Sequence, residues 1–323
     1  MKTIAYTGLW DEFFSEQSLI KKMIHEVCQI EDTRDYMNAD YLLYSLFSEE
    51  HWQVPDSTIK IFYTGENITP DFNACDYAMG FDWLDFGDRY LRFPLYYLYE
   101  DVCDLMEIKH LRPVEKKVDF CSMTISNANR NPIFRDLFSE LSAYKKVDSG
   151  GGWNNNIGGP VDDKLSFDKT HKFSIVCENS SYPGYTTEKL IQAFAANCIP
   201  IYWGDPAVGK VFNKKSFVNV LDYHSIEDVV EKVKEIDQNE VLYFDMLHEP
   251  ALGDFHYSKA QQTEILRNFL SNIFTSSLKE SMRRNRDCRG KMYIDKQRGI
   301  IHENHSDGAL SRMKNFISAH IKS

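Results

Sequence analysis

The sequence predicts an α/β fold with two domains, each built around a mainly parallel sheet. The chain has 323 residues, a length typical of two domains of ordinary size. Hydrophobic residues make up 43% and charged residues 26% of it, which is a globular composition. Short apolar runs alternate along the chain with segments whose apolar residues recur at helical spacing, the pattern of βα units around parallel strands.

The first series of these units occupies the first third of the chain. Leu19, Met23, Ile24 and Val27 give an amphipathic helix over 18–30. The pattern blurs through Glu100–Lys117, a mixed and charged stretch, and we place a domain boundary there, with the first domain at 1–112. The strands predicted in it are Thr3–Tyr6, Tyr41–Leu46, Ile59–Tyr63 and Tyr77–Phe81.

A second α/β series follows and gives a second domain at 113–250. A loop rich in glycine and asparagine is expected over Ser149–Pro160. Ser225 is expected to cap the last helix, with Asp228 three residues later. The strands predicted are Val118–Ser126, Phe173–Cys177, Ile199–Trp203 and Phe217–Val220, and the helices are Ile133–Tyr144, Thr187–Asn197 and Ser225–Ile236. Residues 251–323 are expected to form a helical segment (Ser258–Phe274) and a basic tail.

Composition disfavours several classes of protein. There are 48 acidic against 37 basic residues, a net charge of −11, so nucleic acid is not the expected partner. The seven cysteines form no C-x-x-C pair and no zinc spacing, which favours reduced thiols in a cytoplasmic protein. The N-terminus meets acidic residues too early for a signal peptide, and no apolar run approaches the 18 or so residues that a membrane span needs.

The most informative stretch is 173–206, FSIVCENSSYPGYTTEKLIQAFAANCIPIYWGDP. A buried strand should end at Cys177, and a polar loop should lead to a helix that Thr186 or Thr187 can cap. Lys189 then lies in the first helical turn, where free N–H groups and the dipole already favour an anion. A cation there indicates a bound negative group such as a diphosphate. The alternative is that Lys189 is an ordinary surface lysine and Glu188 an acid that satisfies the dipole.

This stretch resembles the donor-binding motif of the α-1,3/4-fucosyltransferases, glycosyltransferase family 10, and above all the bacterial members. A second segment agrees, with Phe62-Tyr-Thr-Gly-Glu-Asn67, Gly80-Phe81-Asp82 and DRYLRFPLYY over 88–97. A third contains Ser126-Asn-Ala-Asn and Pro132-Ile-Phe-Arg135. The resemblance covers roughly residues 57–250.

The resemblance implies a GT-B architecture, in which two Rossmann-like domains face a central cleft and the second binds the nucleotide sugar. It also implies inverting transfer of L-fucose from GDP-β-L-fucose to the 3-hydroxyl of N-acetylglucosamine in a lactosamine-type glycan. Transfer to the 4-hydroxyl, and a GT-B enzyme using another nucleotide sugar, stay open. The residues that match donor-binding positions of the family are Arg135, Asn179, Tyr185, Glu188 and Lys189.

Glu66 matches the general base proposed for the family, the group that deprotonates the acceptor hydroxyl. Its alternative role is that of a loop acid capping the backbone near Asn67 or Thr69. No cofactor is expected, and a divalent metal at most stimulates, because the chain has no D-x-D triplet and protein cations can neutralise the diphosphate. A catalytically inactive binding module would be expected to lack Glu66, Arg135 or Lys189, and all three are present.

A basic stretch near the C-terminus has two readings. It is a solvated tail, or it is a peripheral anchor to anionic lipid at the inner membrane. Its members are Arg283, Arg284, Arg286, Arg289, Lys291, Lys296 and Arg298. The N-terminal membrane anchor of eukaryotic relatives and the heptad repeats of some bacterial ones are not found in this sequence.

Overall fold

The computed structural model describes residues 1–14, 18–113, 117–126, 131–253 and 256–303. It divides into two compact units, and we describe each by itself. The first contains Met1–Gly80, Leu84–Leu91 and, among the described residues, those from Leu266 onward. The second contains Phe81–Trp83 and Arg92–Ile265.

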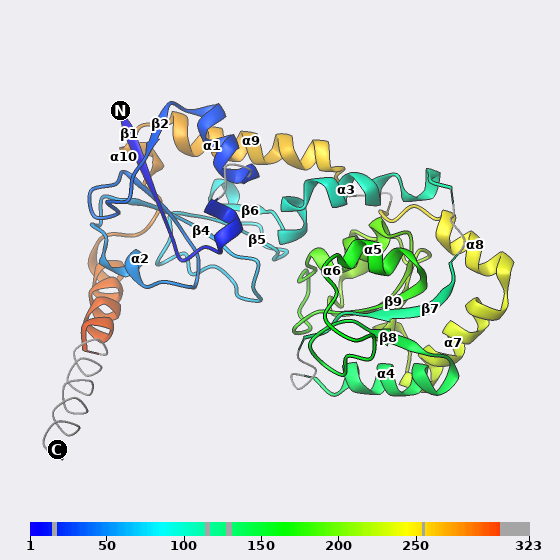
Figure 1. Cartoon of the computed structure of the whole chain (residues 1–323). Helices are drawn as coiled ribbons and strands as arrows, with labels where there is room; N and C mark the ends of the chain where they lie inside the picture. Colours follow the sequence, from blue (N-terminus) through cyan, green and yellow to red (C-terminus); the bar gives the residue numbers. More distant parts are fainter. Residues whose placement is uncertain (15–17, 114–116, 127–130, 254–255, 304–323) are drawn as a thin grey trace, which may run out of the picture. The chain divides into compact units, whose positions relative to one another are not determined.

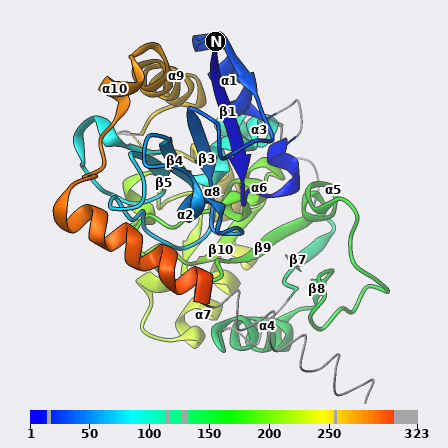
Figure 2. The ribbon, with the colours of Figure 1, turned by 90° about the vertical axis from the view of Figure 1, so that its left-hand side faces the viewer.

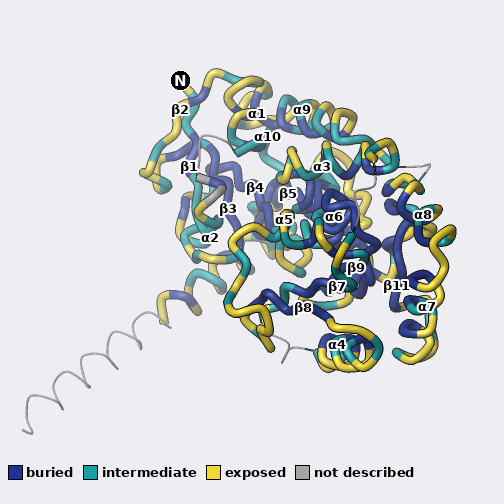
Figure 3. The backbone as a smooth tube through the Cα atoms, turned by 45° about the vertical axis from the view of Figure 1, so that its right-hand side comes forward, coloured by how far each residue is buried: buried dark blue, intermediate teal, exposed yellow. Residues whose placement is uncertain are grey.

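The first unit contains a six-stranded sheet in the order β2-β1-β3-β4-β5-β6. The pairs β1–β2, β1–β3, β3–β4 and β4–β5 are parallel. Every residue of the two central strands is buried, as expected for a parallel sheet covered on both faces (Figure 3). The strands are β1 (Lys2–Thr7), β2 (Ile30–Asp32), β3 (Tyr41–Tyr44), β4 (Ile59–Tyr63), β5 (Tyr77–Gly80) and β6 (Tyr90–Arg92).

Two helices from opposite ends of the chain lie side by side in this unit. The first, α1 (Leu19–Val27), begins after Ser18, whose side chain accepts from the backbone of Lys21, and it buries Ile20, Met23 and Ile24. The other, α9 (Lys259–Thr275), belongs to this unit from Leu266 onward and packs on the sheet there, with the Phe274 ring tilted against that of Tyr41 at a centroid distance of 4.7 Å. An ion pair of 2.8 Å between Arg267 and Glu26 joins the two helices (Figure 1).

The second unit contains a five-stranded, fully parallel sheet in the order β11-β10-β9-β7-β8. Helices α5 and α6 contact each other on one face, and α4 and α7 contact each other on the opposite face (Figure 1). The strands are β7 (Asp119–Met123), β8 (Val147–Ser149), β9 (His171–Cys177), β10 (Ile199–Trp203) and β11 (Val218–Asn219). The helices are α3 (Glu100–Glu107), α4 (Ile133–Tyr144), α5 (Lys164–Lys169), α6 (Glu188–Ala195), α7 (Ile226–Gln238) and α8 (Glu240–His248).

The predicted α/β class with two parallel-sheet domains is confirmed, and several elements match closely. The bounds of β4, α4 and β10 are those predicted, and the predicted cap at Ser225 accepts from the backbone of Asp228. Among the described residues, eight helices and strands were not predicted: the strands β2, β6 and β8 and the helices α2 (Glu50–Gln53), α3, α5, α8 and α10 (Leu278–Ser281). The rotated view in Figure 2 shows β1, β3 and β4 side by side in the first unit.

The units divide the chain differently from the boundaries that we placed at 112 and 250. Residues 92–112 belong to the second unit. There α3 packs on α6, and the buried Lys109 ammonium donates to the carbonyl of Leu247 at 2.9 Å. The segment after Leu266 returns to the first unit, where the Lys2 ammonium donates to the carbonyl of Phe274 at 2.7 Å. Composition alone did not reveal these long-range contacts.

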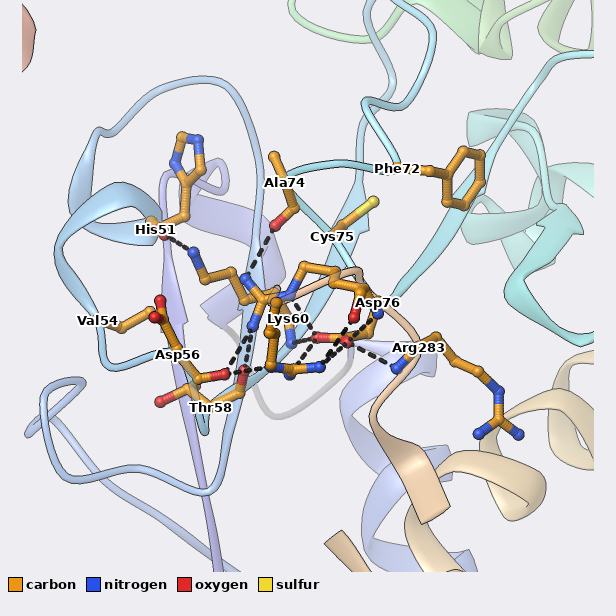
Figure 4. Close-up of polar contacts among 12 residues, drawn as sticks. His51, Val54, Asp56, Thr58, Lys60, Phe72, Ala74, Cys75, Asp76 and Arg283 are labelled. Carbon is orange, nitrogen blue, oxygen red and sulfur yellow. Dashed lines mark hydrogen bonds and ion pairs between the residues drawn. The ribbon is translucent and has the colours of Figure 1, made fainter. Parts of the chain in front are cut away.

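Most of the basic stretch is not a solvated tail, because four of its arginines are bound to acidic residues of the first unit: Arg283, Arg284, Arg286 and Arg298 (Figure 4). Arg284 is 7% exposed, and its Nε lies 2.9 Å from the Asp76 carboxylate, which has no exposed surface. Arg286 contacts the same carboxylate at 3.1 Å, and Arg298 contacts Asp56 at 2.9 Å. We call residues 276–303 the C-terminal strap. The solvated-tail reading was wrong because the acidic partners lie some 200 residues earlier in the chain.

Other members of the basic stretch remain open to solvent. Arg289, Lys291 and Lys296 are exposed, and Lys291 reaches Asp295 at 3.3 Å. Within the described ranges, no helix combines the length and the apolarity needed to cross a bilayer.

Candidate functional site

A cavity of about 360 Å³ opens in the second unit at the carboxyl ends of its central strands. Ligands of parallel α/β sheets bind at this edge. Thr124, Ile125 and Ser126, which follow β7, form one wall. The end of β9, with Ile175, Val176, Cys177 and Asn179, and the first turns of α6, with Glu188, Lys189 and Gln192, form the others. Phe134 of α4 and Lys164 of α5 complete the lining.

Lys189 brings a positive charge to the N-terminus of α6. Its Nζ donates to the Thr187 hydroxyl at 2.9 Å and to Glu188 Oε1 at 3.2 Å, and lies 3.5 Å from Glu178 Oε2. Burial acts to lower the pKa of Lys189, but the two carboxylates outweigh it, so the pKa lies above its ordinary value. The ammonium is therefore permanently charged, and with the free N–H groups of the helix start it favours an anionic ligand.

Glu178 binds the start of the same helix through Thr187. Its carboxylate accepts from the Thr187 backbone N–H at 2.8 Å and from the Thr187 hydroxyl at 2.7 Å. Thr187 occupies the N-cap position, yet its side chain makes no capping bond. Our expectation that a threonine hydroxyl caps this helix was therefore wrong, because the hydroxyl donates to Glu178 instead.

The loop between β9 and α6 presents Asn179 and Tyr185 differently. Asn179 is exposed and lines the cavity, whereas Tyr185 is 2% exposed and packs edge-on against Phe81, with ring centroids 5.1 Å apart. The Pro-Gly turn needs Gly184, whose φ is +92° and where a Cβ would lie 2.6 Å from the carbonyl oxygen of Phe81. Buried Asp205 anchors this turn by accepting from the Gly184 N–H at 2.7 Å.

Arg135 and Lys164 are two further cations near the cavity. Arg135 is exposed in the first turn of α4, directly after Phe134 of the cavity wall, but does not itself line the cavity. The residues just before it, at 127–130, lie outside the described ranges. Lys164 lines the cavity and is ion-paired with the buried carboxylate of Asp168, which also accepts from the Ser122 hydroxyl at 2.6 Å.

Glu66 belongs to the first unit and follows β4 at its carboxyl end. It is exposed, and its backbone N–H donates to the hydroxyl of buried Thr64 at 3.0 Å. Its own carbonyl accepts from Ile68 at 2.8 Å in a tight turn. The turn presents the carboxylate to solvent, as a base that must meet a substrate requires.

Three of the five predicted donor residues therefore gather at one cavity: Asn179, Glu188 and Lys189. Tyr185 and Arg135 lie on adjoining elements, and the roles of all five, like that of Glu66, stay predictions. Sequence reasoning missed Glu178 and Lys164, and it gave Thr187 only a capping role. Glu178 could have been predicted, because it directly follows a buried strand and so lies near the start of the helix that comes next.

Comparisons with known proteins agree with this geometry. Residues 4–99 match the family model for the N-terminal domain of α-(1,3)-fucosyltransferase FucT, and residues 114–263 match that of the glycosyltransferase family 10 (fucosyltransferase) C-terminal region. The α-(1,3)-fucosyltransferase FucT of Helicobacter pylori is 38% identical over 227 residues, which cover 60% of this chain and 47% of that protein. The chain thus spans about half the length of this relative.

Solved structures give the same result. A crystal structure of an α1,3-fucosyltransferase with GDP-fucose matches with a TM-score of 0.71 and 30% identity, covering 85% of this chain and 91% of that one. A second α1,3-fucosyltransferase structure matches with a TM-score of 0.75 and 28% identity, covering 89% and 93%. These similarities confirm the predicted GT-B class of fold. With both family models in chain order and a solved relative covered almost throughout, the chain belongs to glycosyltransferase family 10, the fucosyltransferases.

Proposed function

We propose that the chain transfers L-fucose from GDP-β-L-fucose to the 3-hydroxyl of N-acetylglucosamine in lactosamine-type glycans, with inversion at the fucose carbon. The observation that carries the proposal is Lys189, charged and half-buried at the N-terminus of α6, beside Asn179 in the cavity at the ends of β7 and β9. A solved relative is described as an α1,3-fucosyltransferase with GDP-fucose, which supports this donor.

The chemistry that we assign to the donor side is stabilisation of the leaving group. Breaking the sugar–phosphate bond places negative charge on GDP, and the Lys189 ammonium, with the N–H groups of the helix start, offsets it. Arg135 adds a second positive charge in this proposal. Preorganised groups of this kind contribute on the order of 3–4 kcal/mol each to the transition state. We propose that these cations suffice without a resident metal and that a divalent metal at most stimulates, so turnover should persist in the presence of a chelator.

On the acceptor side, Glu66 accepts the proton of the attacking hydroxyl in this proposal. The hydroxyl attacks the anomeric carbon on the face opposite the diphosphate, so one displacement inverts the configuration. Such base catalysis contributes about 10²–10⁴-fold to the rate. The 4-hydroxyl as target, and a different nucleotide sugar as donor, are the alternatives.

The test is release of GDP from GDP-fucose with a type 2 acceptor, N-acetyllactosamine, and separately with the type 1 isomer. Release that depends on the type 2 acceptor supports 3-linkage, and release only with type 1 indicates 4-linkage. Lys189→Met should raise the Kd for GDP about 10- to 100-fold, because a charge-assisted hydrogen bond contributes about 1.5–3 kcal/mol. Binding of GDP without release from GDP-fucose in either reaction would contradict the proposed donor sugar or acceptor.

Contact of the basic stretch with anionic lipid is a separate proposal, and it falls on the exposed Arg289, Lys291 and Lys296. Flotation with vesicles containing phosphatidylserine, compared between the full chain and the variant with all three changed to Gln, measures it. Equal flotation would contradict the lipid contact.

A further inference from the structure

Glu178 is a buried carboxylate to which the reaction as proposed gives no task. It has no exposed surface, and it directly follows β9, whose last residue, Cys177, lines the cavity. Its carboxylate accepts two hydrogen bonds from Thr187 and lies 3.5 Å from the Lys189 ammonium. One side chain thus contacts both the start of α6 and the cation of the candidate donor site.

The surrounding backbone is shaped to accommodate this side chain. The Glu178 N–H donates to the carbonyl of Trp203 at 2.9 Å, which fixes where the side chain begins. A Cβ at Gly204 would lie 2.4 Å from Glu178 Cγ and 2.7 Å from the Tyr202 hydroxyl. Because no side chain fits at position 204 while Glu178 keeps this position, the glycine of the Trp-Gly-Asp turn leaves room for the carboxylate.

Burying a carboxylate costs free energy of desolvation, which its hydrogen bonds and ion pairs must offset. Burial raises the pKa of Glu178, while Lys189 and the Thr187 donors oppose the rise. A purely structural cap at this helix start needs only the Thr187 hydroxyl, yet here that hydroxyl donates to Glu178 and accepts from Lys189. The arrangement Glu178–Thr187–Lys189 therefore directs the ammonium, which otherwise has four rotatable bonds of freedom.

We propose that Glu178 is a positioning residue: it fixes the Lys189 ammonium and the free N–H groups of α6 at the place where the diphosphate of the donor binds. The inference rests on the proposed function, since it concerns the same site. Glu188, at 3.2 Å from the ammonium, borders the cavity, whereas Glu178 holds the ammonium from the buried side. Glu178 acts on the donor only through Lys189 and the helix start.

The experiment measures the Kd for GDP by titration calorimetry in the unchanged chain, in Glu178→Gln, in Lys189→Met and in the double variant. Glutamine keeps the volume and an acceptor for the Thr187 N–H, but its amide donates toward the groups that the carboxylate accepts from. We expect Glu178→Gln to weaken GDP binding about tenfold, within the range measured for contacting residues. In the Lys189→Met background the same change should alter the Kd by less than about twofold.

Asp237→Asn is the matched control. Asp237 is a carboxylate of the same unit with 1% of its side chain exposed, and it also holds lysines, with Lys172 at 2.7 Å and Lys145 beside it. None of these residues lines the cavity, so the variant should lower the melting temperature and leave the Kd for GDP unchanged. A Glu178→Gln variant that loses melting temperature and keeps its affinity, as this control does, has only a structural role, and that result would overturn the inference.

The remaining outcomes separate the inference from the proposal beneath it. No GDP binding by the unchanged chain overturns the donor assignment and the inference with it. GDP binding that Glu178→Gln weakens equally with and without Lys189 overturns the inference alone. Should Glu178→Gln not fold, Glu178→Asp keeps the charge but shortens its reach, and an unchanged Kd for that variant overturns the inference as well.

Discussion

Several acidic residues of the first unit bind the C-terminal strap. Of these, Asp76 should be the one whose exchange, Asp76→Asn, destabilises the unit most. The Asp76 carboxylate has no exposed surface, and both its oxygens are occupied. It accepts from the backbone N–H groups of Lys60, Arg283 and Arg284, each at 2.9 Å, and it faces the guanidinium groups of Arg284 and Arg286. Asparagine keeps the shape but removes the charge that balances buried Arg284.

The magnitude follows from what is left behind. Breaking one partner of a buried ion pair costs about 3–5 kcal/mol, because the remaining charge is uncompensated. With a urea m-value of about 2 kcal/mol/M, the unfolding midpoint should fall by about 2 M. Two tryptophans of this unit, Trp10 and Trp52, report the transition by fluorescence, and the Trp52 ring lies 5.9 Å from the Lys60 ammonium.

The control is Asp104→Asn in the second unit. Asp104 pairs with Lys259 at 2.6 Å, but its side chain is 57% exposed, so its loss should cost less than about 1 kcal/mol. Hydrogen exchange then locates the change, which should fall on β4, β5 and the strap. A midpoint for Asp76→Asn within experimental error of the unchanged chain would refute the reasoning, because the strap would then contribute nothing to stability.

Three further predictions concern single residues. Glu66→Gln should leave the Kd for GDP within twofold and lower kcat by at least about 100-fold in the GDP-release assay, and full turnover would rule out the base assignment. Gly204→Ala should raise the Kd for GDP in calorimetry, because its Cβ must displace Glu178, whereas Gly158→Ala, where a Cβ meets nothing within 4 Å, should strain only an exposed loop and leave the Kd unchanged. Burial lowers the pKa of His51 to about 4, so the unfolded chain takes up the proton first as pH falls. The free energy of unfolding should therefore drop between pH 6.5 and 4 by up to about 1.4 kcal/mol per pH unit. His51→Phe, which can still stack on Tyr44, should flatten that part of the profile in urea titrations.

Much of the fold could be predicted because its elements are marked locally. The apolar runs of β4 and β10 and the cap of α7 can each be recognised from a few consecutive residues. The strands β2 and β8 escaped because each has three residues, and acids or a serine make up most of them. A strand of that length becomes a strand only through its neighbours in the sheet.

The site was predictable where a motif and a strand end coincide, as at Asn179, Glu188 and Lys189. Glu178 was not predicted because its role depends on three groups that come close to its carboxylate only in the folded chain: the Thr187 N–H, the Thr187 hydroxyl and the Lys189 ammonium. Lys60 shows the same limit in the first unit: it lies fully buried within β4, where its ammonium donates to the carbonyl of His51 (Figure 4). The position of this lysine inside an apolar strand is explained by a carbonyl nine residues away.

The C-terminal strap also determines how late in synthesis the contacts of the first unit can be completed. The backbone N–H of Arg284 that binds Asp76 lies 208 residues further along the chain. At about 5–20 residues per second of synthesis, Asp76 waits about 10–40 s after its own addition before that partner is made. During this interval the second unit is completed between the two halves of the first. Asp76 therefore lacks the backbone N–H and the guanidinium of Arg284 until that residue has been added to the chain.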